Sequence, residues 1–373
     1  MALKQNTKAP ELNRVIIQAP EPKPEKSSFL PVLHGKATDS IARMSSKGVS
    51  VNPITGSLAV TNNDVKLVIE SFNELKATLG VNSHKLLSVG IAQFANLNHI
   101  GTKVPESMVY GVTIPLKEYA FKLGYDVIPH TTETPEEAEE EEERAKKALY
   151  DATKKIKKDL ALLRHSKLPK WTEKIRGKNT DFDETAIIGS HGIRKGFIYM
   201  VFDPLFSEYL IRLPLTQYPL ALLAVDARNS NAYSIGLAMA EHYSLDNNQI
   251  RGTAQLLKVK TLLNYTTLPS IEGIRKQRRN WEDRIKEPFE SALDALTVCG
   301  VLTDWRYSKS KEAELTDEEA TSFTSYEHWA ETLVYFTLKD APDHTARIEA
   351  RQEEKKARQA KGRKKTAKKK EGN

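Results

Sequence analysis

The chain has 373 residues, of which 39% are hydrophobic, and a formal net charge of +7. It is long enough for two or three domains with buried cores, and it has no run of roughly 18 to 20 apolar residues that could cross a membrane. Cys299 is the only cysteine, which excludes an intramolecular disulfide and any multi-cysteine metal site. The N-terminal stretch lacks an apolar signal core, so we expect a cytoplasmic protein.

Most of the positive charge lies at the C-terminal end. From Arg347 to Asn373 twelve Lys or Arg stand against four Glu, a net charge of +8, so the rest of the chain carries −1. Any affinity of the folded part for nucleic acid must therefore come from local patches. The basic tail, which we assign to residues 341–373, would add a sequence-independent attraction to phosphates that salt screens.

Residues 1–55 precede the first predicted domain. Clusters of Pro, Lys and Ser such as APEPKPEKSS show no sustained period, which predicts a disordered arm. From Asn62 to Asn98 the apolar residues recur at helical spacing and predict two helices that break at Gly80. The first helix would carry on one face Val65, Val68, Ile69, Phe72, Leu75 and Leu79.

A long charged helix is predicted after a short strand and a helix that begins after Pro115. The stretch from Thr131 to Ser166 is acidic first and basic later, with a Pro near its start, which suits the helix dipole. The buried stripe would consist of Ala148, Ala152, Ile156, Leu160 and Leu163. The exposed lysines would be Lys147, Lys154, Lys155, Lys157 and Lys158. Two interpretations stay open: a surface helix balanced by its own charges, and a recognition helix for DNA.

Paired strands are predicted to follow this helix. The strand candidates are WTEKI, DETAIIGS and KGFIYMVF, with turns at Gly177 and at His191 and Gly192. Helices, a long charged helix and then paired strands are the order of a winged helix, which favours the recognition interpretation. We place a first winged-helix domain at residues 56–215, with the boundary near Pro214 to Asp226.

Residues Asn231 to Leu338 repeat this order. The apolar helix NAYSIGLAMAEHYSL precedes a short helix in LKVKTLLNYT, a turn at TLPS and one long helical segment from Ile271 to Leu302. Two strands, TDWRY and ETLVYFTL, close the module with a polar loop between them. We predict a second winged-helix domain at residues 216–340. The expected fold class is α+β, mostly helical, with two tandem winged-helix domains.

The two halves of the long segment are predicted to lie in different environments, the second in the core and the first at the surface. Its second half is apolar at helical spacing through Ile285, Phe289, Leu293 and Leu296 and can pack on the first helix of the module. Guanidinium groups bind phosphate or guanine, and an Asn amide can bind adenine. The first half therefore predicts a DNA-reading surface of Arg275, Lys276, Arg278, Arg279, Asn280 and Trp281, with a solvated basic face as the alternative. The acidic loop between the strands leaves only Lys309 and Lys311 at its rim for phosphate contacts.

The sequence lacks the signatures of DNA-processing enzymes. No Gly-Lys is followed by Ser or Thr, so there is no Walker loop, and no two His are separated by one residue as in rolling-circle nickases. The motifs H-E-x-x-H and G-x-S-x-G are also missing. Asp181, Asp183 and Glu184 could hold a metal, but a polar turn is the favoured interpretation. We therefore expect a binding protein, not an enzyme, with no metal and no cofactor.

Six stretches carry a family resemblance. They are IPLKEYAFKLGYDV, KKIKKDLALL, KGFIYMVFDPLFSEYL, YPLALLAVDARNSNAYSIGLAMAEH, LLNYTTLP and WEDRIKEPFESALDALTVCGVLTDWRY. In this order, from about Asn62 to Leu338, the chain resembles the replication initiators of iteron-type plasmids, the Rep proteins with two winged-helix domains. The long acidic loop of the second module and the basic tail depart from the pattern. A loop plus a short helix over Ile271 to Asn280, in place of one continuous helix, would be a third departure.

The resemblance implies a bacterial DNA-binding protein associated with the plasmid or nucleoid. It would bind directly repeated origin sites in double-stranded DNA, help to melt the origin, and recruit the host initiator and replicative helicase. It would act as a monomer on the repeats and as a homodimer when it represses its own promoter. Arg275 to Trp281 would read one major groove and Lys147 to Lys158 the adjacent turn, about 10 base pairs away. The alternatives are a transcription regulator with the same domains and a protein that coats DNA through its tail.

Overall fold

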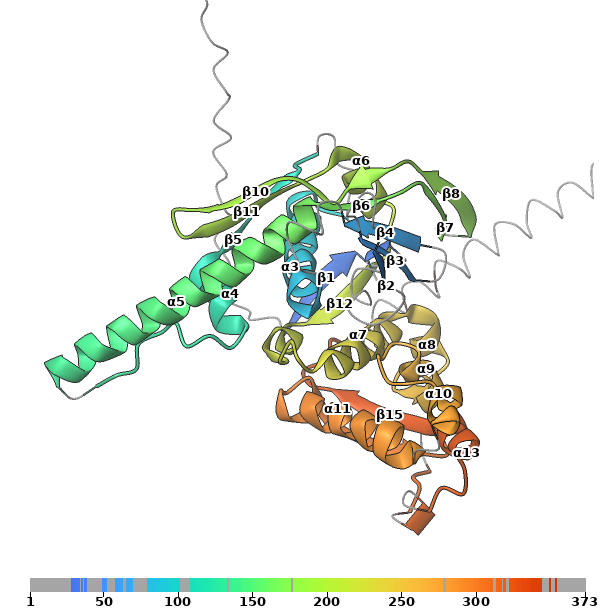
Figure 1. Ribbon diagram of the computed structural model, residues 1–373. Coiled ribbons are helices and arrows are strands. Elements are labelled where there is room, and N and C mark those ends of the chain that lie inside the picture. The colour runs from blue at the N-terminus through green and yellow to red at the C-terminus, as the bar shows by residue number, and fades with distance from the viewer. Residues whose placement is uncertain are drawn as a thin grey trace, which may run out of the picture.

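The protein is an α+β molecule in which helices and small antiparallel sheets alternate along the chain (Figure 1). The computed structural model describes residues 28–33, 35, 37–38, 49–51, 58–62, 65–69, 79–100, 108–132, 134–175, 177–277, 280–310, 313–316, 318–319, 322–343, 349 and 353. None of the helices within these ranges is both long and apolar enough to cross a membrane. The predicted fold class is confirmed at this level.

The first unit is built around a long helix and a three-stranded sheet. Its elements in chain order are α3 (Val81–Leu97), β5 (Gly111–Pro115), α4 (Leu116–Lys122), α5 (Pro135–Arg164), β10 (Ile188–Arg194) and β11 (Phe197–Phe202). The sheet order is β10-β11-β5. The side chain of Thr134 accepts a hydrogen bond from the backbone N–H of Glu137 and Pro135 occupies the first turn, so α5 starts where the sequence predicts.

The second unit repeats this order of elements. They are α7 (Ser230–Ser244), β13 (Leu256–Lys258), α9 (Val259–Leu263), α10 (Ile271–Lys276), the π-helical turn η2 (Glu282–Lys286), α11 (Glu287–Val298), β14 (Leu302–Ser308) and β15 (Leu333–Leu338). Its sheet order is β13-β15-β14. In each unit the strand that comes last in the chain, β11 or β15, therefore lies in the middle of the sheet. The two earlier strands pair with it and not with each other.

A two-stranded ribbon lies between the units (Figure 1). β1 (Phe29–Leu33) pairs antiparallel with β12 (Leu215–Pro219); β1 packs on α3, and β12 packs on α7. The helical turn η1 (Leu220–Ala224) then leads into α7. We expected residues 1–55 to lack structure, but β1 lies within this stretch. The prediction failed there because β1 is stabilised by a partner strand 182 or more positions away, as the pair Leu33↔Leu215 shows, and a local pattern cannot reveal such pairing.

The remaining elements extend the first unit. A five-stranded sheet has the order β2-β3-β4-β6-β9, and β7 pairs with β8. These strands are β2 (Val49–Val51), β3 (Leu58–Asn62), β4 (Val65–Ile69), β6 (Ser166–Leu168), β7 (Trp171–Ile175), β8 (Lys178–Phe182) and β9 (Thr185–Ala186). The described residues also include the short helices α6 (Pro204–Leu210), α8 (Asp246–Ile250) and α13 (Tyr326–Glu331).

Two helix predictions need correction. Residues 65–69 form β4, which pairs with β3, where the sequence predicted a helix. The polar run Asn-Asn-Asp at 62–64 favours a turn between two β-branched stretches, and that signal outweighs the helical spacing. The long helix predicted from Ile271 to Leu302 is broken after Lys276 and restarts at Trp281. Pro288 lacks an N–H and crowds the preceding turn, and the wide turn η2 lies just before it.

The core of the second unit depends on Phe289. Its side chain is 0% exposed and meets the Trp329 ring edge to face at 5.5 Å. We predict that Phe289→Ala lowers the free energy of unfolding by about 3 to 5 kcal/mol. Urea unfolding followed by tryptophan fluorescence measures the loss. Val298→Ala, at an 87% exposed position of the same helix, serves as the control and should change stability by less than about 0.5 kcal/mol. Equal effects of the two substitutions would contradict this view of the core.

Candidate nucleic-acid interface

The C-terminal half of α5 presents a row of basic side chains to solvent. Lys147, Tyr150, Lys154 and Lys157 follow one another at three- and four-residue steps, so they share one face of the helix. We call this set the α5 lysine stripe. All four residues are exposed, and Tyr150 is 70% exposed. The opposite face is buried through Ala152, Ile156, Leu160 and Leu163, as the sequence predicts. Ala148, the fifth residue of that predicted face, is half-buried.

The lysines of the stripe are not neutralised by neighbours. Within the part of the chain that the structure describes, no carboxylate forms an ion pair with Lys147, Lys154 or Lys157, whereas Lys146 lies 3.3 Å from Glu142. Lys155 is exposed and stands over the Tyr125 ring at 5.2 Å from its centroid. Lys158 is also exposed. Unpaired ammonium groups on a helix can attract phosphate at long range and bind it on contact.

The first half of α5 has the opposite charge. Its exposed carboxylates are Glu136, Glu137, Glu139, Glu140, Glu142 and Glu143. α5 has 30 residues, and at about 1.5 Å per residue it is about 45 Å long. Figure 1 shows its acidic end projecting beyond the body. A polyanion would be repelled from this end, which confines the candidate interface to the second half of the helix.

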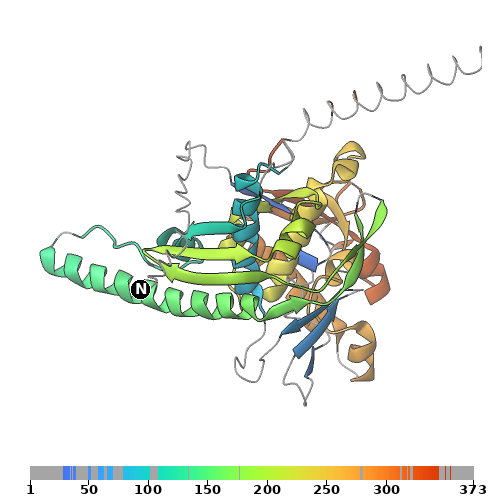
Figure 2. The same ribbon diagram turned by 90° about the horizontal axis from the view of Figure 1, so that it is seen from above.

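A β-hairpin that packs on α5 carries two cations at its tip. β10 and β11 run alongside the C-terminal half of α5 in both views (Figures 1 and 2), and β10 packs on this helix. Arg194 and Lys195 are exposed at its tip. Lys195 has φ +50° and Gly196 has φ +77°, the conformation of a two-residue type I′ turn. The sequence pattern predicted the turn at His191 and Gly192, but both residues lie inside β10, so Arg194 and Lys195 were not among the predicted contact residues.

Burial perturbs two titratable groups beneath this surface. Burial raises the pKa of the Asp159 carboxyl on α5 to about 6, although the Ser83 hydroxyl donates a hydrogen bond to it at 2.6 Å. Burial, together with the nearby Arg164 and His165, lowers the pKa of His191 on β10. The lowered pKa of His191 favours its neutral form.

The basic residues of the second unit are placed differently. Arg275 and Lys276 are exposed at the end of α10, and Arg275 forms an ion pair with Glu327 at 2.5 Å. Lys309 pairs with Glu319 at 2.6 Å. Arg278, Arg279 and Lys311 lie outside the described residues. Of the six positions predicted from Arg275 to Trp281, the structure therefore describes four.

Two of the predicted contact residues already have structural partners. The Asn280 side-chain oxygen accepts a hydrogen bond from the backbone N–H of Glu282 at 3.1 Å, and its amide donates to Asp283 at 3.3 Å. It acts as the cap of the helix that begins at Trp281. The Trp281 ring packs on Trp329 at 5.4 Å and on Tyr326 at 5.8 Å. This ring anchors the segment to the body, and the face that packs there cannot also lie against DNA.

The three carboxylates that the sequence offers for a metal are spread over a hairpin surface. Asp181, Asp183 and Glu184 are all exposed; Asp181 accepts a hydrogen bond from Thr172 at 2.6 Å, and Asp183 lies 3.4 Å from Lys170. Among the described residues, no group of three or more His, Cys, Asp or Glu is arranged to hold a metal ion.

The chain was compared with known proteins. No model of a known protein family and no curated protein sequence matches it.

The capping role of Asn280 can be tested directly. We predict that Asn280→Ala costs about 1 kcal/mol of stability, because it leaves the Glu282 N–H without its acceptor. Asn280→Ser restores an acceptor at this position and should recover most of the loss. Urea unfolding of both variants measures the effect. Equal stability of Asn280→Ala and the native chain would show that the amide is dispensable for the fold.

Proposed function

We propose that this protein is a sequence-specific DNA-binding protein with two tandem winged-helix domains, and that it initiates replication of a plasmid or mobile element. The observation that carries the proposal is that both units share one sheet order, with the third strand between the first and the second. Their element orders also agree once two sets of insertions are set aside, namely β6 to β9 in the first unit and α8, α10, η2 and α13 in the second. A chain that repeats helix, strand, helix, helix and a strand pair with this pairing fits two winged helices. Such domains place the helix before the strand pair in the major groove.

In the first domain, α5 would be the recognition helix and the β10–β11 hairpin the wing. The α5 lysine stripe offers unpaired ammonium groups, and the wing tip offers Arg194 and Lys195. The acidic half of α5 would stay outside the groove because its carboxylates repel phosphates. The duplex would then lie along the helix from Lys147 to Lys158, with the wing tip on the neighbouring backbone.

In the second domain, the segment from Arg275 to Trp281 would approach an adjacent half-site. Lys276 is exposed there, and Arg278 and Arg279 follow in the sequence. Arg275 would exchange its carboxylate partner Glu327 for a phosphate or a base. An exposed ion pair of this kind is screened by water and contributes little to stability, so the exchange costs little. The wing of this domain would contribute Lys309, also by exchange of a carboxylate partner.

Replication initiation is the role that the resemblance to iteron-type initiators supports. Under this proposal the protein binds direct repeats, helps to open the neighbouring duplex and recruits the host initiator and helicase. It would act in the bacterial cytoplasm on plasmid or nucleoid DNA, and a homodimer would repress its own promoter. No cofactor and no catalytic residue of the chain enter this scheme.

The lysine stripe provides a point test. We predict that Lys154→Ala combined with Lys157→Ala weakens binding to repeat and random duplexes alike, since lysine contacts to phosphate carry no base information. The slope of log binding constant against log salt should become shallower by about 2, because each lysine that neutralises a phosphate contributes about 1. Lys146→Ala is the matched control, because Lys146 sits on the same helix and is paired with Glu142. An unchanged slope in the double variant would remove α5 from the interface.

Footprinting of the DNA that flanks the coding region tests the biological role. We predict protection of direct repeats about 20 base pairs long, in phase with the turns of the duplex, together with opening of the adjacent strands. Permanganate reactivity of unpaired thymines reports that opening. Protection of a single palindrome at a promoter, without strand opening, would instead favour a transcription regulator built from the same domains.

A further inference from the structure

A lysine is buried where the two units meet. Lys85 on α3 is 1% exposed, and its ammonium donates hydrogen bonds to the backbone carbonyls of Leu223 at 2.9 Å and Val225 at 2.5 Å. These carbonyls belong to the end of η1 and the residue after it, in the segment that leads from β12 into α7. A side chain of the first unit thus holds the chain that enters the second.

The surroundings of Lys85 make this contact specific. The ammonium lies 5.7 Å from the centroid of the Tyr233 ring on α7, so it touches the second unit through an aromatic face as well. Within the described residues no carboxylate forms an ion pair with it. A buried ammonium that leaves its acceptors becomes an unsatisfied charge in a medium of low polarity. Burial lowers the pKa of Lys85 to about 8, and the carboxylate of Asp226 partly offsets that effect.

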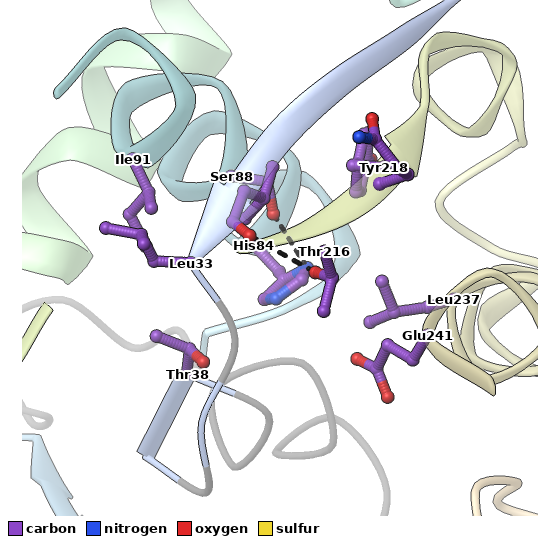
Figure 3. A pocket seen from close by; sticks show the side chains of 11 residues that line it. Leu33, Thr38, His84, Ser88, Ile91, Thr216, Tyr218, Leu237 and Glu241 are labelled. Carbon is purple, nitrogen blue, oxygen red and sulfur yellow. Dashed lines mark hydrogen bonds between the residues drawn. The ribbon is translucent and has the colours of Figure 1, made fainter. Parts of the chain in front are cut away.

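A second polar contact spans the same joint. Nδ1 of His84 on α3 lies 2.6 Å from the Tyr233 hydroxyl on α7, and that hydroxyl lies 3.2 Å from the hydroxyl of Tyr218 on β12. Figure 3 shows His84 beside Ser88 in a small pocket that Leu33, Thr216, Tyr218, Leu237 and Glu241 also line. The pocket therefore draws its walls from α3, from the β1–β12 ribbon and from α7.

The apolar and the polar contacts at this joint resist movement of one unit against the other to different degrees. Apolar side chains at a joint tolerate small sliding movements, because dispersion and burial are non-directional. A buried ammonium bonded to two carbonyls has one arrangement that satisfies it. The Tyr233 hydroxyl, by contrast, has several hydrogen-bonding neighbours, among them His84, Tyr218 and Ser88, and can lose one while it keeps the others.

We propose that Lys85 is a positioning residue that fixes the angle between the two units, and thereby the spacing at which their recognition helices meet successive turns of DNA. This inference rests on the proposed function for its DNA part. Its structural part, one fixed angle between the units, stands apart from any ligand.

The structural part is tested without DNA. Spin labels are attached to Asp151→Cys on α5 and Val298→Cys on α11 in the full chain carrying Cys299→Ala, and electron–electron resonance gives the distribution of distances between them. Both label sites are exposed. We expect one narrow distribution with Lys85 present and a distribution at least about twofold wider in Lys85→Met, whose apolar end keeps the volume but makes neither bond.

Two further variants make the outcome decisive. Tyr233→Phe removes the hydroxyl contacts and leaves the ring beside Lys85, so its distribution should stay narrow. Lys85→Gln replaces Lys85→Met if the latter fails to fold, since an amide keeps a donor but is too short to reach both carbonyls. An unchanged width in a folded Lys85 variant would overturn the proposal. Failure of both variants to fold would also overturn it, by making Lys85 a requirement for folding.

The DNA part uses the protected repeat with two base pairs inserted between its halves, which turns one half by about 70° relative to the other. The native chain should lose affinity by about tenfold or more on this insertion, and Lys85→Met by less than about threefold. Equal losses would show that Lys85 does not set the spacing. If the native chain binds no repeat at all, the proposed function is wrong. The spin-label distances still test whether Lys85 fixes the angle between the two units.

Discussion

Two units with separate sheets keep one orientation toward a common partner only if the surface between them resists movement. Here that surface is built around α3, whose buried residues face in nearly every direction. β1 covers one side and β11 lies close on another, where a side chain at Gly90 would collide with Met200. Lys85 and His84 on the same helix reach across to the second unit. The central helix of the first unit is therefore also the main element of the joint.

Local signals in the sequence were enough to predict the elements that begin and end within a few residues. α5 was predicted because Pro135 and the acidic residues after it mark its start and its apolar face repeats over many turns. Pairing between distant segments has no such signal, which is why β1 was expected to be part of a disordered arm. β4 was missed because a five-residue apolar stretch fits either period, and only its pairing with β3 decides between them.

The surroundings of the candidate site residues could be predicted only where they follow from local periodicity. Exposure of the α5 lysines follows from helical periodicity, so the sequence was sufficient. At Asn280 and Trp281 the residue type has a second use that the sequence did not reveal, since an Asn just before a helix start serves as a cap and a Trp serves as an anchor. Arg194 and Lys195 were overlooked because they matter for binding only if the hairpin lies beside α5 (Figure 2). That is a tertiary contact, which the spacing of residues in the sequence does not predict.

The distribution of charge gives the two units different parts in the proposed binding. The α5 lysine stripe is unpaired among the described residues, so it can attract phosphates before contact. Arg275 and Lys309 are held by Glu327 and Glu319 and become available only by exchange at short range. The first unit would thus supply most of the approach, and the second would engage once the duplex is close. Binding in these two steps is favoured by a fixed angle between the units, because a second unit that rotates freely would lose the orientation that the first unit has set.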